Sequence, residues 1–162
     1  MATDPENTLV LETTKGRVVI ALRPDLAPGH VERIKTLARR GFYDGIVFHR
    51  VIDGFMAQTG CPKGTGTGGS DLPDLPAEFS KEPFVRGTLG MARSQDPNSA
   101  SCQFFIMHKT STSLDGQYSG FGQLVSGLEV VDKIVNVKRN SQDKPFDTQT
   151  IKKCTVVKAG GK

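Results

Sequence analysis

Short β-rich runs recur along most of the chain, and the clearest of them has the period of two typical of β-strands. In one such run, Val18 and Ile20 fall on one face and Val19 falls on the other. Glycine, proline or polar residues separate the runs, as they do at turns. We expect strands over 9–13, 17–22, 50–52, 55–58, 87–92, 103–107, 118–125 and 150–157.

Two segments have a helical period instead. Across 29–40, Val31, Ile34 and Leu37 recur at helical spacing, and Gly41 follows where a residue with positive φ commonly ends a helix. A similar apolar stripe covers 128–135. The chain therefore has seven or eight strands, two helices and no alternation of strand and helix. This pattern predicts an antiparallel barrel or closed sheet whose ends the two helices cover.

Length and composition fit one soluble domain. The chain has 162 residues, of which 36% are hydrophobic and 23% charged. We expect a single domain over 1–162, with a core over about 8–158, a flexible N-terminal arm and a frayed C-terminal tail. No apolar run is long enough to span a bilayer, and the polar N-terminus lacks the pattern of a secretion signal. These features predict a cytoplasmic protein without a membrane partner.

Charge, cysteine and histidine patterns exclude several classes of site. The formal net charge is +4, but basic residues occur only as dispersed doublets, so no nucleic-acid interface is expected. Three cysteines, an odd number at scattered positions, fit a reducing compartment. No cysteine pair has zinc-ligand spacing, and the three histidines lie far apart in sequence. We therefore expect no metal and no cofactor.

The segment 48–58 carries the most informative chemistry. Gly54 can form a tight turn between two short strands, and such a hairpin brings Arg50, Phe55, Met56 and Gln58 to one surface. That surface combines an apolar floor with hydrogen-bond donors. It suits a short peptide better than a nucleotide.

Two other motifs point to different chemistry and are weak. The glycines of 64–69 match a dinucleotide-binding spacing, but they neither follow a buried strand nor open a helix. Cys102 could be a nucleophile with His49 or His108 as its base, although a buried small residue is the more common role. His49 directly precedes Arg50 and so points to the opposite face of that strand. A thiol or dinucleotide enzyme is thus an alternative that depends on one of these motifs.

Seven motifs occur in order between residues 9 and 157, and together they resemble the cyclophilins, a family of peptidyl-prolyl cis-trans isomerases. They are GFYDG at 41–45, FHRVI at 48–52, GFMAQ at 54–58, GTGG at 66–69, GMA at 90–92, SCQFFI at 101–106 and LDG at 114–116. The resemblance is strongest to bacterial cytosolic members. It implies a mainly β fold, a closed eight-stranded antiparallel β-barrel capped by two α-helices.

The resemblance also implies a groove outside the barrel in which an X-Pro segment docks. Arg50 matches the catalytic arginine of the family. Gln58, assigned with Arg50 to the catalytic group, and Gln103 match the glutamines that bond the peptide and orient the arginine. The positions that match substrate-binding residues are Phe55, Met56, Gly66, Ala92, Arg93, Gln103, Phe105, Leu114 and Tyr118. The implied partners are proline-containing peptides and flexible protein segments, bound by a monomer.

The chain departs from the common eukaryotic pattern around the groove. Arg93 stands where asparagine is common, Ser113 replaces a tryptophan that helps to bind cyclosporin, and Tyr118 replaces a histidine. The loop 94–101 is one residue longer. We expect catalysis to tolerate these changes and cyclosporin to bind weakly. A binding module without turnover is the competing class, but retention of Arg50 and of the pocket residues favours an enzyme.

Overall fold

The computed structural model describes residues 7–62, 64, 72–80, 83–93, 96, 98–111, 114–141 and 143–156. In this part of the chain, eight strands and two helices follow one another. They are β1 (Thr8–Thr13), β2 (Gly16–Leu22), α1 (Pro28–Arg39), β3 (Arg50–Ile52), β4 (Met56–Thr59), β5 (Thr88–Met91), β6 (Phe104–Met107), β7 (Gly120–Ser126), α2 (Leu128–Val135) and β8 (Ile151–Val156). Every expected strand and helix is confirmed, with boundaries shifted by at most two residues.

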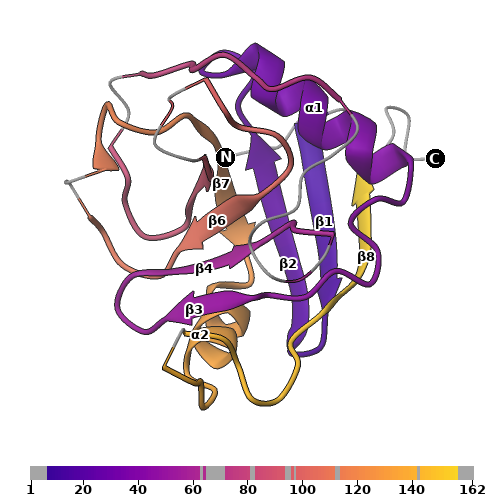
Figure 1. The fold of residues 1–162 in the computed structure, drawn as a ribbon, viewed down its shortest axis with the longest axis vertical. Helices are drawn as coiled ribbons and strands as arrows, with labels where there is room; N and C mark the ends of the chain where they lie inside the picture. The colour runs from indigo at the N-terminus through magenta and orange to yellow at the C-terminus, as the bar shows by residue number, and fades with distance from the viewer. Residues whose placement is uncertain are drawn as a thin grey trace.

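The strands form one curved antiparallel sheet in the order β3-β4-β6-β5-β7-β2-β1-β8. Short hairpins join β1 to β2 and β3 to β4, whereas β6 lies between β4 and β5 (Figure 1). The order therefore places β3, β4, β6 and β5 side by side. Four candidate site residues, Arg50, Met56, Gln58 and Phe105, lie on these strands.

The prediction of a closed barrel overstates the closure of the sheet. The two edge strands β3 and β8 do not pair; instead the residues before each of them meet, through a single bridge between Val47 and Thr150. The Phe48 N–H donates to the Gln149 carbonyl at 2.7 Å. β3 is only three residues long, and the N–H of its central Val51 donates to the Asp143 carbonyl rather than to a strand. The sheet is thus a half-barrel, and the segments that precede β3 and β8 meet beside the gap between these two edge strands.

The two helices close the ends of this sheet, α1 at one end and α2 at the other (Figure 1). Both insert their apolar stripe into the main core, to which α1 contributes Ile34 and Leu37 and α2 contributes Val131 and Ile134. The Glu78 carboxylate accepts the Gly29 and His30 N–H groups at the start of α1, where Ala27 provides no side-chain cap. Gly41 follows α1 with a φ of 73°, as expected.

Apolar residues gather in two clusters on the two faces of the sheet. The main core fills the interior and includes Phe104 and Ile106 of β6. A smaller group on the outside, which we name the outer cluster, consists of Met56, Phe84, Phe105 and Met107. All four are at least 95% buried. Alternation along β6 therefore supplies both clusters from four consecutive residues.

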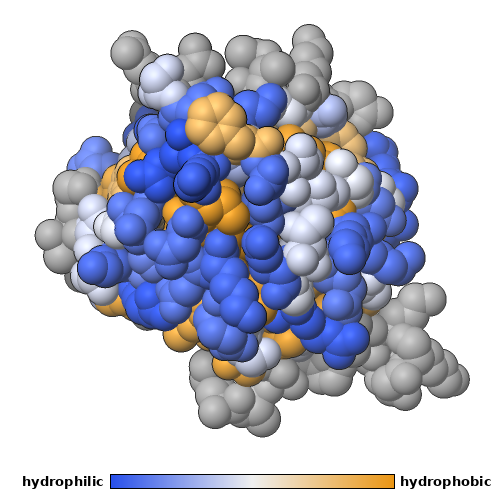
Figure 2. Space-filling model, turned by 90° about the horizontal axis from the view of Figure 1, so that it is seen from below, coloured by the Kyte–Doolittle hydropathy of each residue, from blue (hydrophilic) through white to orange (hydrophobic). Residues whose placement is uncertain are grey.

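The surface outside these clusters is mainly polar. Seen from below, hydrophobic colour appears in small areas separated by hydrophilic side chains (Figure 2). Across the described residues, no helix has the length and hydrophobicity needed to cross a membrane.

Candidate active site

The β3–β4 hairpin positions the predicted arginine. Arg50 lies opposite Gln58 in the antiparallel register, and Ile52 lies opposite Met56. Gly54 turns the chain with a φ of 81°, a conformation that L-residues adopt at a cost. Val51 points inward and is fully buried, whereas Arg50 is exposed. The hairpin thus anchors its inner side in the core and presents its outer side to a ligand.

A polar network holds the tip of this hairpin. The Gly54 N–H donates to His108 Nδ1 at 2.8 Å, so His108 Nε2 carries the proton that it donates to Asp132 at 2.9 Å. The Asp132 carboxylate also accepts one hydrogen bond from each terminal nitrogen of Arg86, at 3.0 Å each. These hydrogen bonds from Arg86 lower the pKa of the Asp132 carboxyl below its usual value. The turn is therefore tied to α2 and to the segment before β5.

An open cavity of about 270 Å³ lies over the outer face of the four strands. Met56 and Phe105 of the outer cluster line its floor, and Phe105 stacks on Phe84 with ring centroids 6.0 Å apart. Nine residues line it: Arg50, Phe55, Met56, Gln58, Ala92, Arg93, Phe105, Leu114 and Tyr118. All nine were predicted as site residues from the sequence. Residues far apart in the chain thus meet in one cavity that combines an apolar floor with polar edges.

The remaining predicted residues lie beside the cavity or outside the described residues. Gln103 contacts the site through Gln58, whose Nε2 donates to Gln103 Oε1 at 3.0 Å. Gly66 and Ser113 lie outside the described residues, as do residues 94, 95 and 97 of the lengthened loop.

The Arg50 guanidinium lies at the solvent-exposed edge of the cavity. It has neither a hydrogen bond nor an ion pair with any residue that the structure describes. Gln58 is its neighbour in register but donates to Gln103. The guanidinium therefore has its fork of N–H donors available to a ligand. That Gln58 orients the arginine stays a prediction.

A second arginine forms the far wall of the cavity. The Arg93 guanidinium lies over the Tyr118 ring, with Cζ 4.5 Å from the ring centroid, and its Nη2 donates to the Gln117 carbonyl at 2.6 Å. Tyr118 in turn meets the edge of Phe105, with centroids 5.7 Å apart. The wall is thus a packed stack continuous with the floor.

Sequence reasoning missed two residues that shape the floor. Phe84 is 98% buried beneath the cavity, but in the sequence it follows a stretch rich in glycine and proline, where no hydrophobic periodicity marks it. Gly90 faces Phe105 across the β5–β6 ladder, and a Cβ there would lie 2.5 Å from Phe105 Cζ and 2.6 Å from Phe84 Cε2. Only a glycine lets the two rings occupy these places. The motif around Gly90 was noted, yet its role depends on packing that the sequence does not display.

The side chains proposed for thiol chemistry have other surroundings. Cys102 is fully buried in the main core, and its carbonyl accepts the Tyr43 hydroxyl at 2.7 Å. His108 belongs to the polar network of the hairpin tip. His49 is 93% buried, and this burial, followed by the charges of Arg50 and Lys144, lowers its pKa to about 4. Among the described residues, no group of three or more potential ligands is placed to hold a metal ion.

Comparison with known proteins assigns the family. Residues 8–156 match the family described as cyclophilin type peptidyl-prolyl cis-trans isomerase/CLD. A relative from Brucella suis, a probable peptidyl-prolyl cis-trans isomerase, is 60% identical over 144 residues, which cover 82% of this chain and 74% of the relative. A Synechococcus elongatus peptidyl-prolyl cis-trans isomerase is 42% identical, over 80% of this chain and 93% of its own.

The fold agrees with solved structures of the same family. A Cryptosporidium parvum cyclophilin type isomerase, crystallised in the presence of the dipeptide Ala-Pro, superposes with a TM-score of 0.88 and is 30% identical. The match covers 92% of this chain and 98% of that one. The chain therefore belongs to the cyclophilin-type peptidyl-prolyl cis-trans isomerases, enzymes that accelerate rotation about X-Pro bonds and assist protein folding.

Proposed function

We propose that the cavity beside Arg50 binds the proline of an X-Pro segment and that Arg50 is the catalytic residue. The observation that carries this proposal is an exposed guanidinium at the edge of a cavity whose apolar floor includes the Phe105 ring. The Cryptosporidium parvum relative crystallised with Ala-Pro supports a proline-containing ligand.

The chemistry required is rotation about a partial double bond. The nitrogen lone pair is delocalised into the carbonyl, which gives a barrier of about 18–20 kcal/mol. X-Pro bonds populate both isomers but interconvert in tens to hundreds of seconds. No covalent bond breaks, so a catalyst has only to stabilise the twisted state, in which the lone pair is localised on nitrogen.

Arg50 would supply that stabilisation by donating a hydrogen bond toward the imide nitrogen. The nitrogen is a poor acceptor while resonance persists and a good one when the bond is twisted. The hydrogen bond is therefore stronger in the transition state than in the ground state. A guanidinium suits this role because it stays charged and holds its donors in a rigid fork.

The apolar floor would hold the pyrrolidine ring while the acyl side turns. Phe55, Met56, Phe105 and Leu114 line this part of the cavity, and a ring seated against them would displace water from it. A donor in such a partly dry site is stronger than the same donor in bulk water. An acceleration of about 10⁵-fold corresponds to about 7 kcal/mol, which one charged donor and fixed positioning can supply together.

Polar groups beside the floor would hold the peptide backbone. Gln58 lines the cavity opposite Arg50 in the β3–β4 register, and its side chain donates to Gln103 Oε1. Ala92 and Gly66 are the proposed contacts of the neighbouring groove. These residues position substrate and take no proton, so the reaction needs no general base.

The test replaces Arg50 and measures isomerisation directly. Arg50→Ala should lower kcat/KM for an Ala-Pro peptide by 100- to 1,000-fold, roughly 3–4 kcal/mol, when followed by exchange NMR. Arg50→Lys keeps the charge and loses the fork of donors, so its kcat/KM should fall between those of the wild type and Arg50→Ala. Arg17→Ala is the matched control, because Arg17 is an exposed arginine of β2 paired with Glu12. Near-normal turnover of folded Arg50→Ala would refute the assignment.

The remaining proposals concern partners and location. We propose a single-domain monomer that acts on unfolded or flexible segments in the cytoplasm, where three buried thiols, those of Cys61, Cys102 and Cys154, stay reduced. Cyclosporin should bind weakly because Ser113 replaces the tryptophan common in the family. Submicromolar inhibition of the isomerase by cyclosporin would contradict that proposal.

A further inference from the structure

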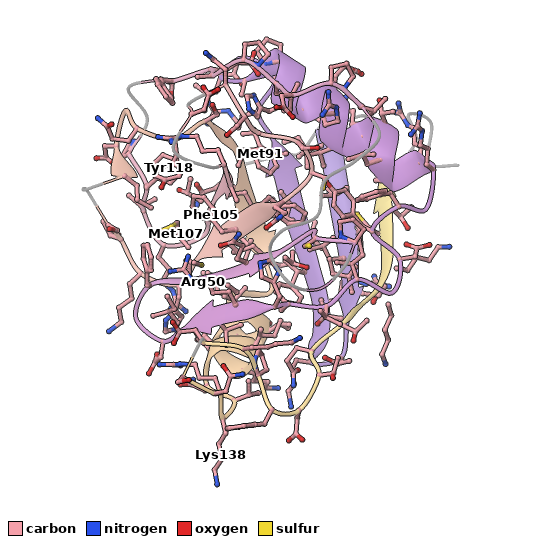
Figure 3. The ribbon with its side chains drawn as sticks, viewed as in Figure 1. Arg50, Met91, Phe105, Met107, Tyr118 and Lys138 are labelled. Carbon is pink, nitrogen blue, oxygen red and sulfur yellow. The ribbon has the colours of Figure 1, made fainter. Side chains whose placement is uncertain are left out.

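The cavity has a positively charged side chain at each end. Arg50 belongs to β3, and Arg93 follows β5; β4 and β6 lie between these two strands. Phe105 of β6 accordingly lies between Arg50 and the Tyr118 ring on which Arg93 packs (Figure 3). The proposed proline seat is thus flanked by one arginine assigned to catalysis and by another with no assigned role for its side chain.

Arg93 is held in place relative to the floor. Its guanidinium packs on Tyr118 and donates to Gln117, while Tyr118 packs on Phe105. The backbone leading to it is fixed as well, because the Ala92 N–H donates to the Gln103 carbonyl at 2.9 Å. A charge presented by a packed ring and a hydrogen bond is pre-organised, since little side-chain entropy remains to be lost when a ligand binds.

The described lining of the cavity is positive without compensation from its own members. Of its nine residues two are arginines, and none carries a carboxylate. Asp115, next to the lining residue Leu114, accepts the Phe84 N–H at 2.7 Å and serves the floor. A concave apolar surface lined by one sign of charge focuses the field and raises the local concentration of oppositely charged ligands.

We infer that Arg93 is a specificity residue that favours X-Pro segments with an acidic residue within about two positions of the proline and disfavours basic ones. This inference rests on the proposed binding of proline beside Arg50. Three strand spacings of about 4.8 Å separate β3 from β5, and a bound peptide advances about 3.3 Å per residue. A proline over Phe105 therefore leaves its close neighbours, rather than distant residues, within reach of Arg93.

The experiment measures kcat/KM for acetylated, amidated peptides that differ only in glutamate, glutamine or lysine at one position beside Ala-Pro. An ion pair at a partly exposed site contributes up to about 1 kcal/mol, about fivefold in kcat/KM. We expect glutamate to exceed glutamine by about that factor at low salt and lysine to fall below it, mainly through KM. Raising the ionic strength to 0.5 M should shrink the difference, since screening then acts within about 5 Å.

Variants assign the effect to Arg93. Arg93→Gln should bring the glutamate-to-lysine ratio close to the small value that Arg50 alone sustains, and Arg93→Lys should retain part of it. Arg17→Gln removes the same charge from an exposed site outside the cavity and should leave the ratio unchanged. Circular dichroism and turnover of the glutamine peptide report whether each variant is folded.

The outcomes separate this inference from the proposed function. A wild-type enzyme that turns over the glutamine peptide but shows no glutamate preference overturns the inference and leaves the role of Arg50 intact. A preference that survives in Arg93→Gln overturns it equally. Absence of turnover of all three peptides by the wild type overturns the proposed function itself.

Discussion

The two faces of β6 are both apolar but have different surroundings. Phe104 and Ile106 face the interior and are fully buried in the main core. Phe105 and Met107 face outward and are at least 95% buried, but Phe105 lines an open cavity. The inner face is enclosed by strands and by both helices, whereas the outer face is covered by a few loop side chains.

This difference separates stability from recognition within one strand. An inner side chain has neighbours on every side, so its removal leaves a cavity in the core. An outer side chain such as Phe105 offers part of its surface to the cavity, so its removal changes the shape presented to a ligand. Replacing a phenylalanine on the inner face is thus expected to lower stability, whereas replacing one on the outer face is expected to lower activity.

The sharpest test of this comparison replaces the two adjacent phenylalanines. Phe104→Ala should lower the free energy of unfolding by about 3–5 kcal/mol, because a fully buried ring leaves a cavity. Phe105→Ala should cost less stability and reduce kcat/KM for an Ala-Pro peptide by at least tenfold. Urea unfolding and exchange NMR measure the two effects. Equal losses of stability and of activity in both variants would erase the distinction between the faces.

A second test uses the neighbours His49, which is buried, and Arg50, which is exposed. Burial lowers the pKa of His49 to about 4, so the unfolded chain takes up a proton near pH 6.5 and the folded one does not. The stability that neutral His49 provides is therefore complete above pH 6.5 and is lost as the pH falls toward 4, by up to about 3 kcal/mol. His49→Phe should flatten the dependence of stability on pH over this range.

Two measurements check this pH effect. Urea unfolding at pH 7.5, 6 and 5 compares the wild type with His49→Phe, and both keep His30, whose pKa is also lowered by burial. An NMR titration of the His49 ring gives its pKa directly. A ring that titrates near pH 6.5 would show that its burial has no electrostatic cost.

A third test fills the space beneath the floor. Gly90→Ala places a Cβ within 2.6 Å of the Phe84 and Phe105 rings, so both rings must move. We expect a loss of about 1–3 kcal/mol of stability from overpacking, together with weaker binding of Ala-Pro peptides. Gly120→Ala is the control, since its Cβ would meet Phe84 at an ordinary 3.5 Å. If Gly90→Ala matches the control in KM and in stability, the rings of the outer cluster can move at little cost in free energy, and the expectation is wrong.

The smallest expected effect concerns the glutamine pair. Gln103→Leu removes the acceptor of the Gln58 side chain while keeping a similar volume. A few-fold decrease in kcat/KM should follow, with stability changed by about 1 kcal/mol or less. Gln123→Leu, at a glutamine bonded to Thr88 outside this cavity, should leave kcat/KM unaltered. Unchanged turnover in Gln103→Leu would remove the pair from the proposed machinery.

Most of the secondary structure and of the cavity lining was predictable from the chain. Alternation located β2, and helical periodicity located both helices. The residues from 48 to 58 stay together in space, since a tight turn at Gly54 joins two short strands. The more distant lining residues, such as Leu114 and Tyr118, were identified by their resemblance to a known family rather than from periodicity.

The local pattern of the chain was sufficient for its strands, its helices and the hairpin that carries Arg50, because these depend on neighbours within a few residues. Three features depended on contacts between distant segments: the open seam between β3 and β8, the stacking of Phe84 beneath Phe105, and the packing of Arg93 on Tyr118. Each arises where loops without periodicity are folded back onto the sheet. The physical reason is that packing and charge across such contacts are set by three-dimensional position, which the order of residues does not display.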